Sequence, residues 1–236
     1  MMSAYYLRKN VFCCLANGHL VFLDLDTDKY LCLDQERSKI YPNLWTDKLH
    51  QSPDRSRDDE LNTITQALIE QCLITQNPKE GASLCPPSLP QATETLATFN
   101  NTDMHANIRH RHIFRFIKAA SIAAYRLRFQ SLKHVVQQVK VRRSRYEKVL
   151  PEYDDAQARI LVNSFTALRP LLPSKGQCLF DALALIEFLA SYRLFPHWVF
   201  GVRMAPFTAH CWVQNENIVY TDPLDHIASL TPIMVA

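Results

Sequence analysis

The sequence predicts an α+β protein that is built from two domains. In residues 1–77, three short strands separated by polar turns precede helices. In residues 106–236, an almost continuously apolar helix precedes strands of an antiparallel sheet. Residues 78–105 lie between the two, hold several prolines among serine, threonine and asparagine, and are predicted to form a flexible linker.

Composition limits the protein classes to consider. The chain has 236 residues, 47% of them hydrophobic, which is enough for a real core. No apolar run reaches the length of a membrane span, and the first residues lack the apolar region of a signal peptide, so a cytoplasmic location is expected. The seven cysteines include no C-x-x-C pair, so neither a disulfide scaffold nor a zinc site is indicated and no cofactor is expected. Cys13, Cys14, Cys32 and Cys72 are expected in the core because each lies in an apolar run.

The first domain shows a strand pattern followed by a helix. Asn17-Gly18 is a strong hairpin signal, and a helix over residues 59–72 is indicated by apolar residues at helical spacing. The three predicted strands are Val11–Ala16, His19–Leu25 and Lys29–Leu33. This order is typical of a small winged-helix module. Binding to nucleic acid is disfavoured, because the domain has no dense basic stripe and an acidic run opens its last helix.

Cys178 stands at the beginning of the most apolar segment of the chain. From Leu179 to Leu189 every residue except Asp181 and Glu187 is apolar, which predicts a helix that is buried on most sides. In the first turn of such a helix, free backbone N–H groups and the helix dipole favour a thiolate. The alternative is a packed, unreactive cysteine, since free cysteine is among the most buried residue types.

A histidine and an aspartate follow in a predicted hairpin. Residues 209–214 and 217–221 are expected to pair around a three-residue loop centred on Glu216, and this register places His210 opposite Asp222. Opposed Cβ atoms are about 4.5–5.5 Å apart, so the carboxylate would reach the ring and fix its tautomer. The alternative is a polar pair on the surface. The flanking residues are mostly apolar and indicate a core sheet instead.

The order Cys178, His210, Asp222 is the one that a thiol nucleophile, its base and an orienting acid would need in a papain- or transglutaminase-like fold. The runs C-L-x-x-A-L-A-L, V-x-G-V and F-x-A-H-x-W-V, with a closing strand that ends in Asp, resemble the lasso-peptide B proteins. These are transglutaminase-like cysteine proteases that remove the leader from a ribosomal precursor peptide. The resemblance covers roughly residues 106–236. It implies a domain with a buried catalytic helix and an antiparallel sheet, with Cys178 as nucleophile, His210 as base and Asp222 as its orienting partner.

A second resemblance concerns the first domain. The run G-H-L-V-F-L-D-L-x-x-D-K-Y-L-C-L-D is similar to the precursor-recognition domains of peptide-modifying enzymes, which look like the small chaperone of quinone-cofactor biosynthesis. It implies that a leader peptide binds as an added strand along Lys29–Leu33, with Tyr30, Leu31 and Cys32 as candidate contacts. An edge strand offers unpaired backbone groups for such binding. These side chains could equally serve only to fill the core and the edge.

Residues 106–150 are strongly basic. They contain 12 Lys and Arg residues and one acidic residue, a net charge of +11 in a chain whose total is +3. One buried helix face is expected to carry the apolar side chains, with the cations on the other face and in the tail 140–145; the apolar positions are Ile113, Phe116, Ile117, Ala120, Ala124 and Leu127. A solvated face is one interpretation. A docking surface for an acidic partner or for phosphates is the other.

The predicted activity is that of a cysteine peptidase that cleaves off the leader and frees the amine of the core peptide for macrolactam cyclisation. The backbone N–H of Cys178 would help to hold the oxyanion, and Gln177 is a possible second donor. The expected partners are the precursor peptide and an asparagine-synthetase-like lasso cyclase. Two alternatives stay open: an acyl transferase of the transglutaminase type, which would use the same triad, and a non-catalytic peptide chaperone. Asp225 and His226 are assigned to a surface turn.

Overall fold

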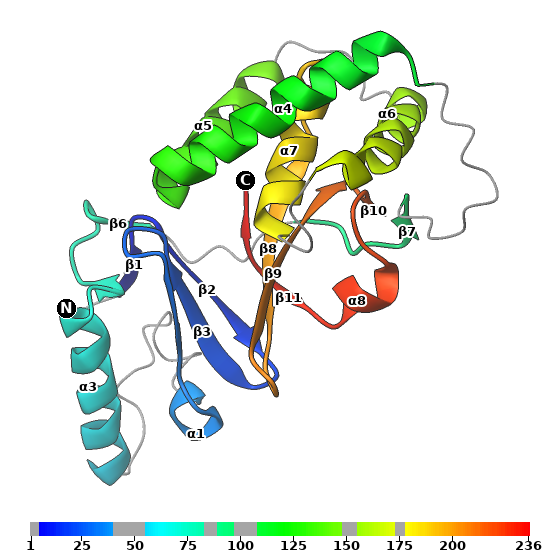
Figure 1. The fold of residues 1–236 in the computed structure, drawn as a ribbon. Coiled ribbons are helices and arrows are strands. Elements are labelled where there is room, and N and C mark those ends of the chain that lie inside the picture. Colours follow the sequence, from blue (N-terminus) through cyan, green and yellow to red (C-terminus); the bar gives the residue numbers. More distant parts are fainter. Residues whose placement is uncertain (1–4, 40–54, 83–88, 97–107, 148–154, 173–177) are drawn as a thin grey trace. The chain divides into compact units, whose positions relative to one another are not determined.

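The computed structural model describes residues 5–39, 55–82, 89–96, 108–147, 155–172 and 178–236, and Figure 1 shows the course of the chain. The chain divides into two compact units, Met1–Ser88 with Arg203–Phe207 and Leu89–Val202 with Thr208–Ala236. Both units combine helices with strands, which is the mixed composition that the sequence predicts. Among the described residues, no helix combines the length and the apolar character needed to span a membrane.

Within its described residues, the first unit contains two small sheets, with strand orders β2-β3-β4 and β5-β1-β6. Its strands are β1 (Tyr6–Arg8), β2 (Val11–Ala16), β3 (His19–Asp24), β4 (Lys29–Cys32), β5 (Ile74–Thr75) and β6 (Gly81–Ala82). Its helices are α1 (Gln35–Ser38) and α3 (Arg55–Glu70). Ile64 and Leu68 of α3 pack with Leu20 and Phe22 of β3 in one apolar cluster. The small sheet built on β1 and the short helix α1 have no counterpart in the sequence prediction.

The β2–β3 hairpin follows the prediction closely. Ala16 pairs with His19, so Asn17-Gly18 forms a two-residue loop. Both loop residues have positive φ, 49° and 79°, as a type I′ turn requires. Two cysteine predictions are wrong, however. Cys32 and Cys72 are exposed, and Cys72 adopts φ 59° directly after α3, where the chain leaves the helix.

The second unit holds a five-stranded sheet with strand order β11-β8-β9-β10-β7. Its strands are β7 (Glu94–Thr95), β8 (His197–Arg203), β9 (Thr208–Asn215), β10 (Ile218–Val219) and β11 (Thr231–Val235). Its helices are α4 (His110–Phe129), α5 (Leu132–Glu147), α6 (Asp155–Leu168), the 3-10 turn η1 (Arg169–Leu171), α7 (Cys178–Ala190) and α8 (Leu224–Ala228). Strand β7 runs parallel to β10, while β10 runs antiparallel to β9.

Part of the predicted linker is built into sheets. Strand β6 pairs with β1 in the first unit, and β7 pairs with β10 in the second. The backbone N–H groups of Thr93 and Leu96 donate to the carbonyls of Asn217 and Val219 over 2.8 Å each. The interpretation of residues 78–105 as a simple linker therefore does not hold for these positions. No local apolar pattern announces such short strands, because their partners lie far along the chain.

Helix α7 is the central element of the second unit, and its residues from Ala182 to Leu189 are all buried. It packs against α4 and α6 and against strand β9, and Figure 1 shows α4 crossing it. In the sheet, Gly201 of β8 allows the close approach of Trp212, because a Cβ atom on Gly201 would lie 2.6 Å from the Trp212 ring. This contact explains the glycine of the V-x-G-V run.

The buried face of α4 differs from the expected one. The helix buries His112, Phe116, Ala119, Ala120 and Ala123. Ile113 and Ile117, which the sequence places on the buried face, are 38% and 55% exposed. Apolar side chains occur on more than one face of this helix, so the sequence pattern alone does not select the buried face. The packing partner α7 decides between them.

Candidate active site

Cys178 is the first residue of α7. Its side chain is half-buried and lines an open pocket of about 400 Å³ together with His210, Cys211 and Asp222. The first backbone N–H groups of a helix have no partner within the helix, and the positive end of the helix dipole lies there. The position of Cys178 at this helix terminus therefore favours a negatively charged sulfur.

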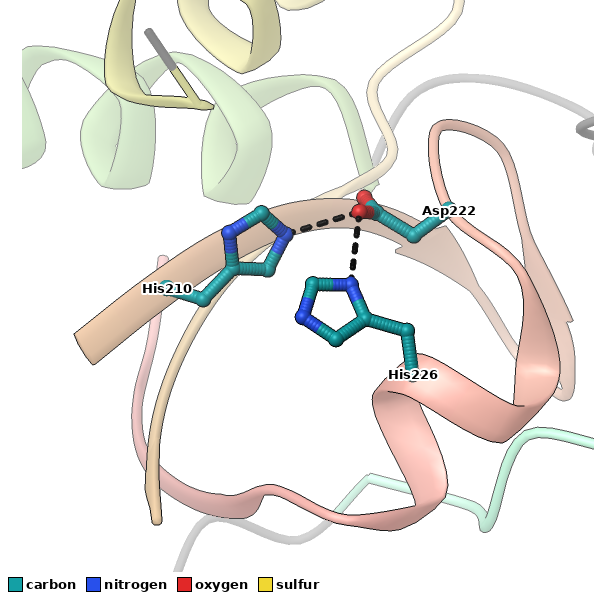
Figure 2. A group of neighbouring side chains, drawn as sticks. All are labelled: His210, Asp222 and His226. Atoms are coloured by element: carbon teal, nitrogen blue, oxygen red, sulfur yellow. Dashed lines mark hydrogen bonds and ion pairs between the residues drawn. The ribbon is translucent and has the colours of Figure 1, made fainter. Parts of the chain in front are cut away.

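His210 lies on β9, and Asp222 follows β10. The Nε2 atom of His210 is 2.8 Å from Oδ1 of Asp222, a contact that is drawn in Figure 2. Both side chains are mostly buried, with 16% and 13% of their surface exposed. Thr221 donates its hydroxyl to the other carboxylate oxygen, Oδ2, over 2.6 Å. Asp222 is thus held on both of its oxygens and presents one of them to the imidazole.

The register that led to this pair is wrong by one residue, although the pair forms. Ile218 pairs with Asn215, and Val219 with Gln214, so the loop has two residues and not three. Glu216 accepts φ 46° in this loop. A one-residue slip normally turns side chains to the opposite face. Asp222 escapes this consequence because β10 ends at Val219 and the chain bends before it reaches the carboxylate.

Cys178, His210 and Asp222 form a continuous hydrogen-bonded chain, with His210 in the middle. Cys178 accepts hydrogen bonds from the Cys211 thiol and from His210, and these lower its pKa to about 4 although burial acts in the opposite direction. Burial lowers the pKa of His210, but the hydrogen bonds to Asp222 and Cys178 outweigh it and raise this pKa to about 9. At neutral pH the pair is therefore a thiolate and an imidazolium.

Asp222 completes the charge arrangement. Burial acts to raise its pKa, but hydrogen bonds from His210 and Thr221 outweigh that effect and hold the pKa below its ordinary value. The carboxylate therefore stays ionised and stabilises the imidazolium. Because Asp222 occupies Nε2 of His210, Nδ1 is the ring nitrogen left for the sulfur.

Two residues of the site were missed or undervalued in the sequence analysis. Cys211 donates to Cys178, and this hydrogen bond is the largest cause that raises the pKa of Cys211 well above its ordinary value. Neighbours on a strand point to opposite faces, so a strand that presents His210 gave no reason to add Cys211. His226, assigned to a surface turn, lies on α8 with its Nδ1 3.4 Å from Oδ1 of Asp222. The i, i+4 spacing from Asp222 was the available signal.

The candidate leader-binding residues lie in the first unit. Tyr30, Leu31 and Cys32 belong to β4, which pairs with β3 on one side and is the edge of its sheet among the described residues. Tyr30 and Leu31 are partly buried, and Leu31 packs against the apolar cluster of the unit. Their role in binding a peptide stays a prediction.

Several arginines of the basic segment, residues 106–150, bind other groups of the same chain. Arg126 and Arg142 both bind the buried carboxylate of Glu187 in α7. Arg143 donates to the carbonyl of Phe195 over 3.1 Å, and Arg115 donates to the carbonyl of Ser191 over 2.6 Å. A uniformly solvated basic face is therefore not what the structure shows. Exposed cations of α4 remain candidates for a docking surface.

The second unit places a cysteine at the start of a buried helix, a histidine on strand β9 and an aspartate just after β10. Residues 120–235 match the transglutaminase-like superfamily. The match covers slightly less than half of the chain and includes all three site residues. The second unit thus contains a transglutaminase-like domain, a fold that is typical of cysteine peptidases and acyltransferases. Neither curated proteins nor solved structures give a significant match.

Proposed function

We propose that the protein is a cysteine peptidase that cleaves the leader from a ribosomally made lasso precursor peptide. The observation that carries the proposal is the hydrogen-bonded chain from Cys178 through His210 to Asp222 at the wall of an open pocket. A thiolate that is formed before substrate binds, with a cationic acid beside it, is the starting state of acyl transfer from a peptide.

The first half of the reaction uses the ion pair directly. The Cys178 thiolate attacks the carbonyl carbon at the junction of leader and core, and the carbonyl oxygen becomes an oxyanion. The backbone N–H of Cys178 lies at the helix N-terminus and is a candidate donor to that oxyanion; Gln177 lies outside the described residues. As the C–N bond breaks, His210 gives its proton to the leaving amine, so the core peptide departs with a free N-terminus.

The second half restores the enzyme. The leader is now held as a thioester on Cys178. His210, neutral after the first half, takes a proton from water, and the resulting hydroxide attacks the thioester carbonyl. The leader leaves with a carboxylate, and the thiolate and imidazolium form again. Asp222 keeps the imidazole in one tautomer and stabilises its charged form in both halves.

The substrate class is supported by two further features. The motifs around the three site residues resemble those of lasso-peptide B proteins, and the first unit presents an edge strand, β4, to which an extended leader could add by backbone hydrogen bonds. Binding the leader on one unit and cutting it on the other raises the local concentration of the cleavage site. The freed core amine is the group that an asparagine-synthetase-like cyclase would join into a macrolactam.

The direct test incubates the full chain with a lasso precursor peptide and weighs the products by mass spectrometry. Hydrolysis gives free leader and free core and supports the proposal. If an added amine is joined to the leader in place of water, the protein is an acyl transferase of the transglutaminase type. If the peptide binds and stays intact, the protein is a peptide chaperone and the proposal is overturned.

A further inference from the structure

His226 brings a third potential metal ligand to the His210–Asp222 pair. The Nε2 atom of His210 lies 2.8 Å from Oδ1 of Asp222, and the Nδ1 atom of His226 lies 3.4 Å from the same oxygen. One ligand atom from each of the three residues can be chosen so that all lie within 4.8 Å of one another. Figure 2 shows both rings turning a nitrogen toward the same carboxylate. The proposed peptidase mechanism uses His210 and Asp222 and assigns no role to His226.

The donor set and its spacing fit one class of cation. Two imidazoles and a carboxylate suit Zn²⁺ and related transition metals, whereas Mg²⁺ and Ca²⁺ prefer oxygen ligands alone. Bonds of about 2.0–2.1 Å in a tetrahedral Zn²⁺ site place neighbouring ligand atoms about 3.4 Å apart. The separations of 2.8 and 3.4 Å are close to that value, so small side-chain movements would open the space between the three atoms.

The group is also accessible from solvent. The side chain of His226 is 42% exposed, and the rings of His210 and His226 lie 4.7 Å apart between centroids. The pocket next to them is open. A cation could therefore enter past His226, and water could fill the fourth coordination position, as it does in sites with three protein ligands.

We propose that His210, Asp222 and His226 form a Zn²⁺ site that switches off the cysteine chemistry. Zn²⁺ bound at Nε2 of His210 takes the place of the hydrogen bond to Asp222 and draws the carboxylate to the metal. The imidazole then keeps its proton on Nδ1 and has no free nitrogen with which to accept another. Giving up that proton would leave a metal-bound imidazolate, so His210 can no longer serve as the acid that protonates the leaving amine, and the thioester does not form. The inhibition rests on the proposed peptidase function, whereas the binding of the metal does not.

The binding is tested by titration calorimetry of the full chain with Zn²⁺, and by the visible absorption of Co²⁺ as a probe of coordination. We expect one site, and an affinity at least about tenfold lower in His226→Ala, because one of three protein ligands is lost. The matched control is His110→Ala, which removes an exposed histidine from α4 and should leave the affinity unchanged. A Cys178→Ala variant should also keep the site.

The opposite pattern overturns the inference. If Zn²⁺ binding is lost in Cys178→Ala and kept in His226→Ala, the metal is captured by the thiol and not by the histidine pair. If neither variant changes the affinity, the cation binds elsewhere. Thermal melts of each variant show whether it is folded. Because calorimetry and absorption need no substrate, they decide on the site even if the chain cleaves no peptide.

Inhibition is measured separately, as the rate of precursor cleavage with added Zn²⁺ and after removal of the metal by EDTA. We expect loss of cleavage that EDTA reverses, and a weaker effect of Zn²⁺ on the His226→Ala variant. Equal inhibition of both proteins would contradict the proposed link between this site and the reaction.

Discussion

Cys178 lies at the start of α7 and Glu187 near its end; both have charged partners, but their surroundings differ. Near the end of the helix, Glu187 is only 5% exposed and is bound by Arg126 and by Arg142. Arg142 reaches both carboxylate oxygens, over 2.8 and 2.9 Å. At the start of the helix, Cys178 is half-buried, opens on a pocket and has a histidine as its charged partner.

The difference lies in whether the counter-charge can move. Arginine stays protonated at every accessible pH, so the counter-charge beside Glu187 is permanent and cannot be passed to another group. A histidine can release its proton and bind it again, so the charged partner of Cys178 can transfer a proton while the sulfur reacts. The ion pairs of Glu187 join α7 to α4 and α5, whereas the Cys178–His210 pair is the one that the proposed reaction uses. This comparison yields four predictions.

The largest effect is expected from Cys178→Ala. Without the sulfur no thioester can form, and cleavage of the precursor should fall to the background rate, while the melting temperature changes little. Cys72→Ser, which alters an exposed cysteine of the first unit, is the matched control and should cleave normally. A Cys178→Ala protein that still cuts would remove this residue from the nucleophile role.

Asp222→Asn should slow cleavage by about 10²-fold or more, because the amide can neither stabilise the imidazolium nor hold the correct tautomer. The effect should appear in kcat more than in KM, since the carboxylate touches the imidazole and not the substrate. Steady-state kinetics on the folded variant make this check. A change confined to KM would point to a binding role instead.

At the other end of the helix, Glu187→Gln should destabilise the fold by about 3 kcal/mol, because two largely buried arginines lose their counter-charge. The free energy of unfolding in urea measures this. Glu94→Gln is the control, since its ion pair with Arg159 is about half exposed on both sides and such pairs contribute about 1 kcal/mol or less. If both variants lose the same stability, the two ion pairs are equivalent and the comparison fails.

The smallest effect concerns the acid side of the pH profile. The thiolate of Cys178 is present above about pH 4, and the imidazolium of His210 is present below about pH 9. Cleavage, measured with EDTA present, should therefore rise through the first value and fall through the second.

Cys211→Ala sharpens this prediction. It removes the hydrogen bond that lowers the pKa of Cys178 most, so the acid limb should move to higher pH while the alkaline limb stays in place. Alkylation of Cys178 by iodoacetamide, followed by mass spectrometry at each pH, reports the thiolate without any substrate. An unmoved acid limb would show that Cys211 does not contribute to the ionisation of Cys178.

Much of the site follows from local sequence signals, and its details do not. The apolar run after Cys178 is sufficient to predict a buried helix, and Asn17-Gly18 is sufficient to predict the first hairpin. The second hairpin was displaced by one residue because Glu216 takes a left-handed conformation that sequence favours for Asn or Gly. The position of Asp222 depends on the bend after β10, and no pattern in the sequence describes that bend.

The contacts that cross long sequence distances were the hardest to predict. The packing of β9 on α7 brings Cys211 to the site. The packing of α4 and α5 on α7 brings their arginines to Glu187. Strand β7 has only two residues, too few for any periodicity. In each case the contacting residue lies on another helix or strand, so the local sequence around either residue does not predict the contact.

Strand β7 bears on where a fragment that contains the transglutaminase-like domain can begin. Thr95 donates its hydroxyl to the backbone carbonyl of Asp222 over 2.7 Å, so the residue that orients the imidazole is anchored from a stretch that looks dispensable. A shortened protein that starts at residue 106 would lack this anchor and leave β10 as an open border of the sheet. A fragment that is meant to keep the Asp222 anchor should therefore begin before Leu89.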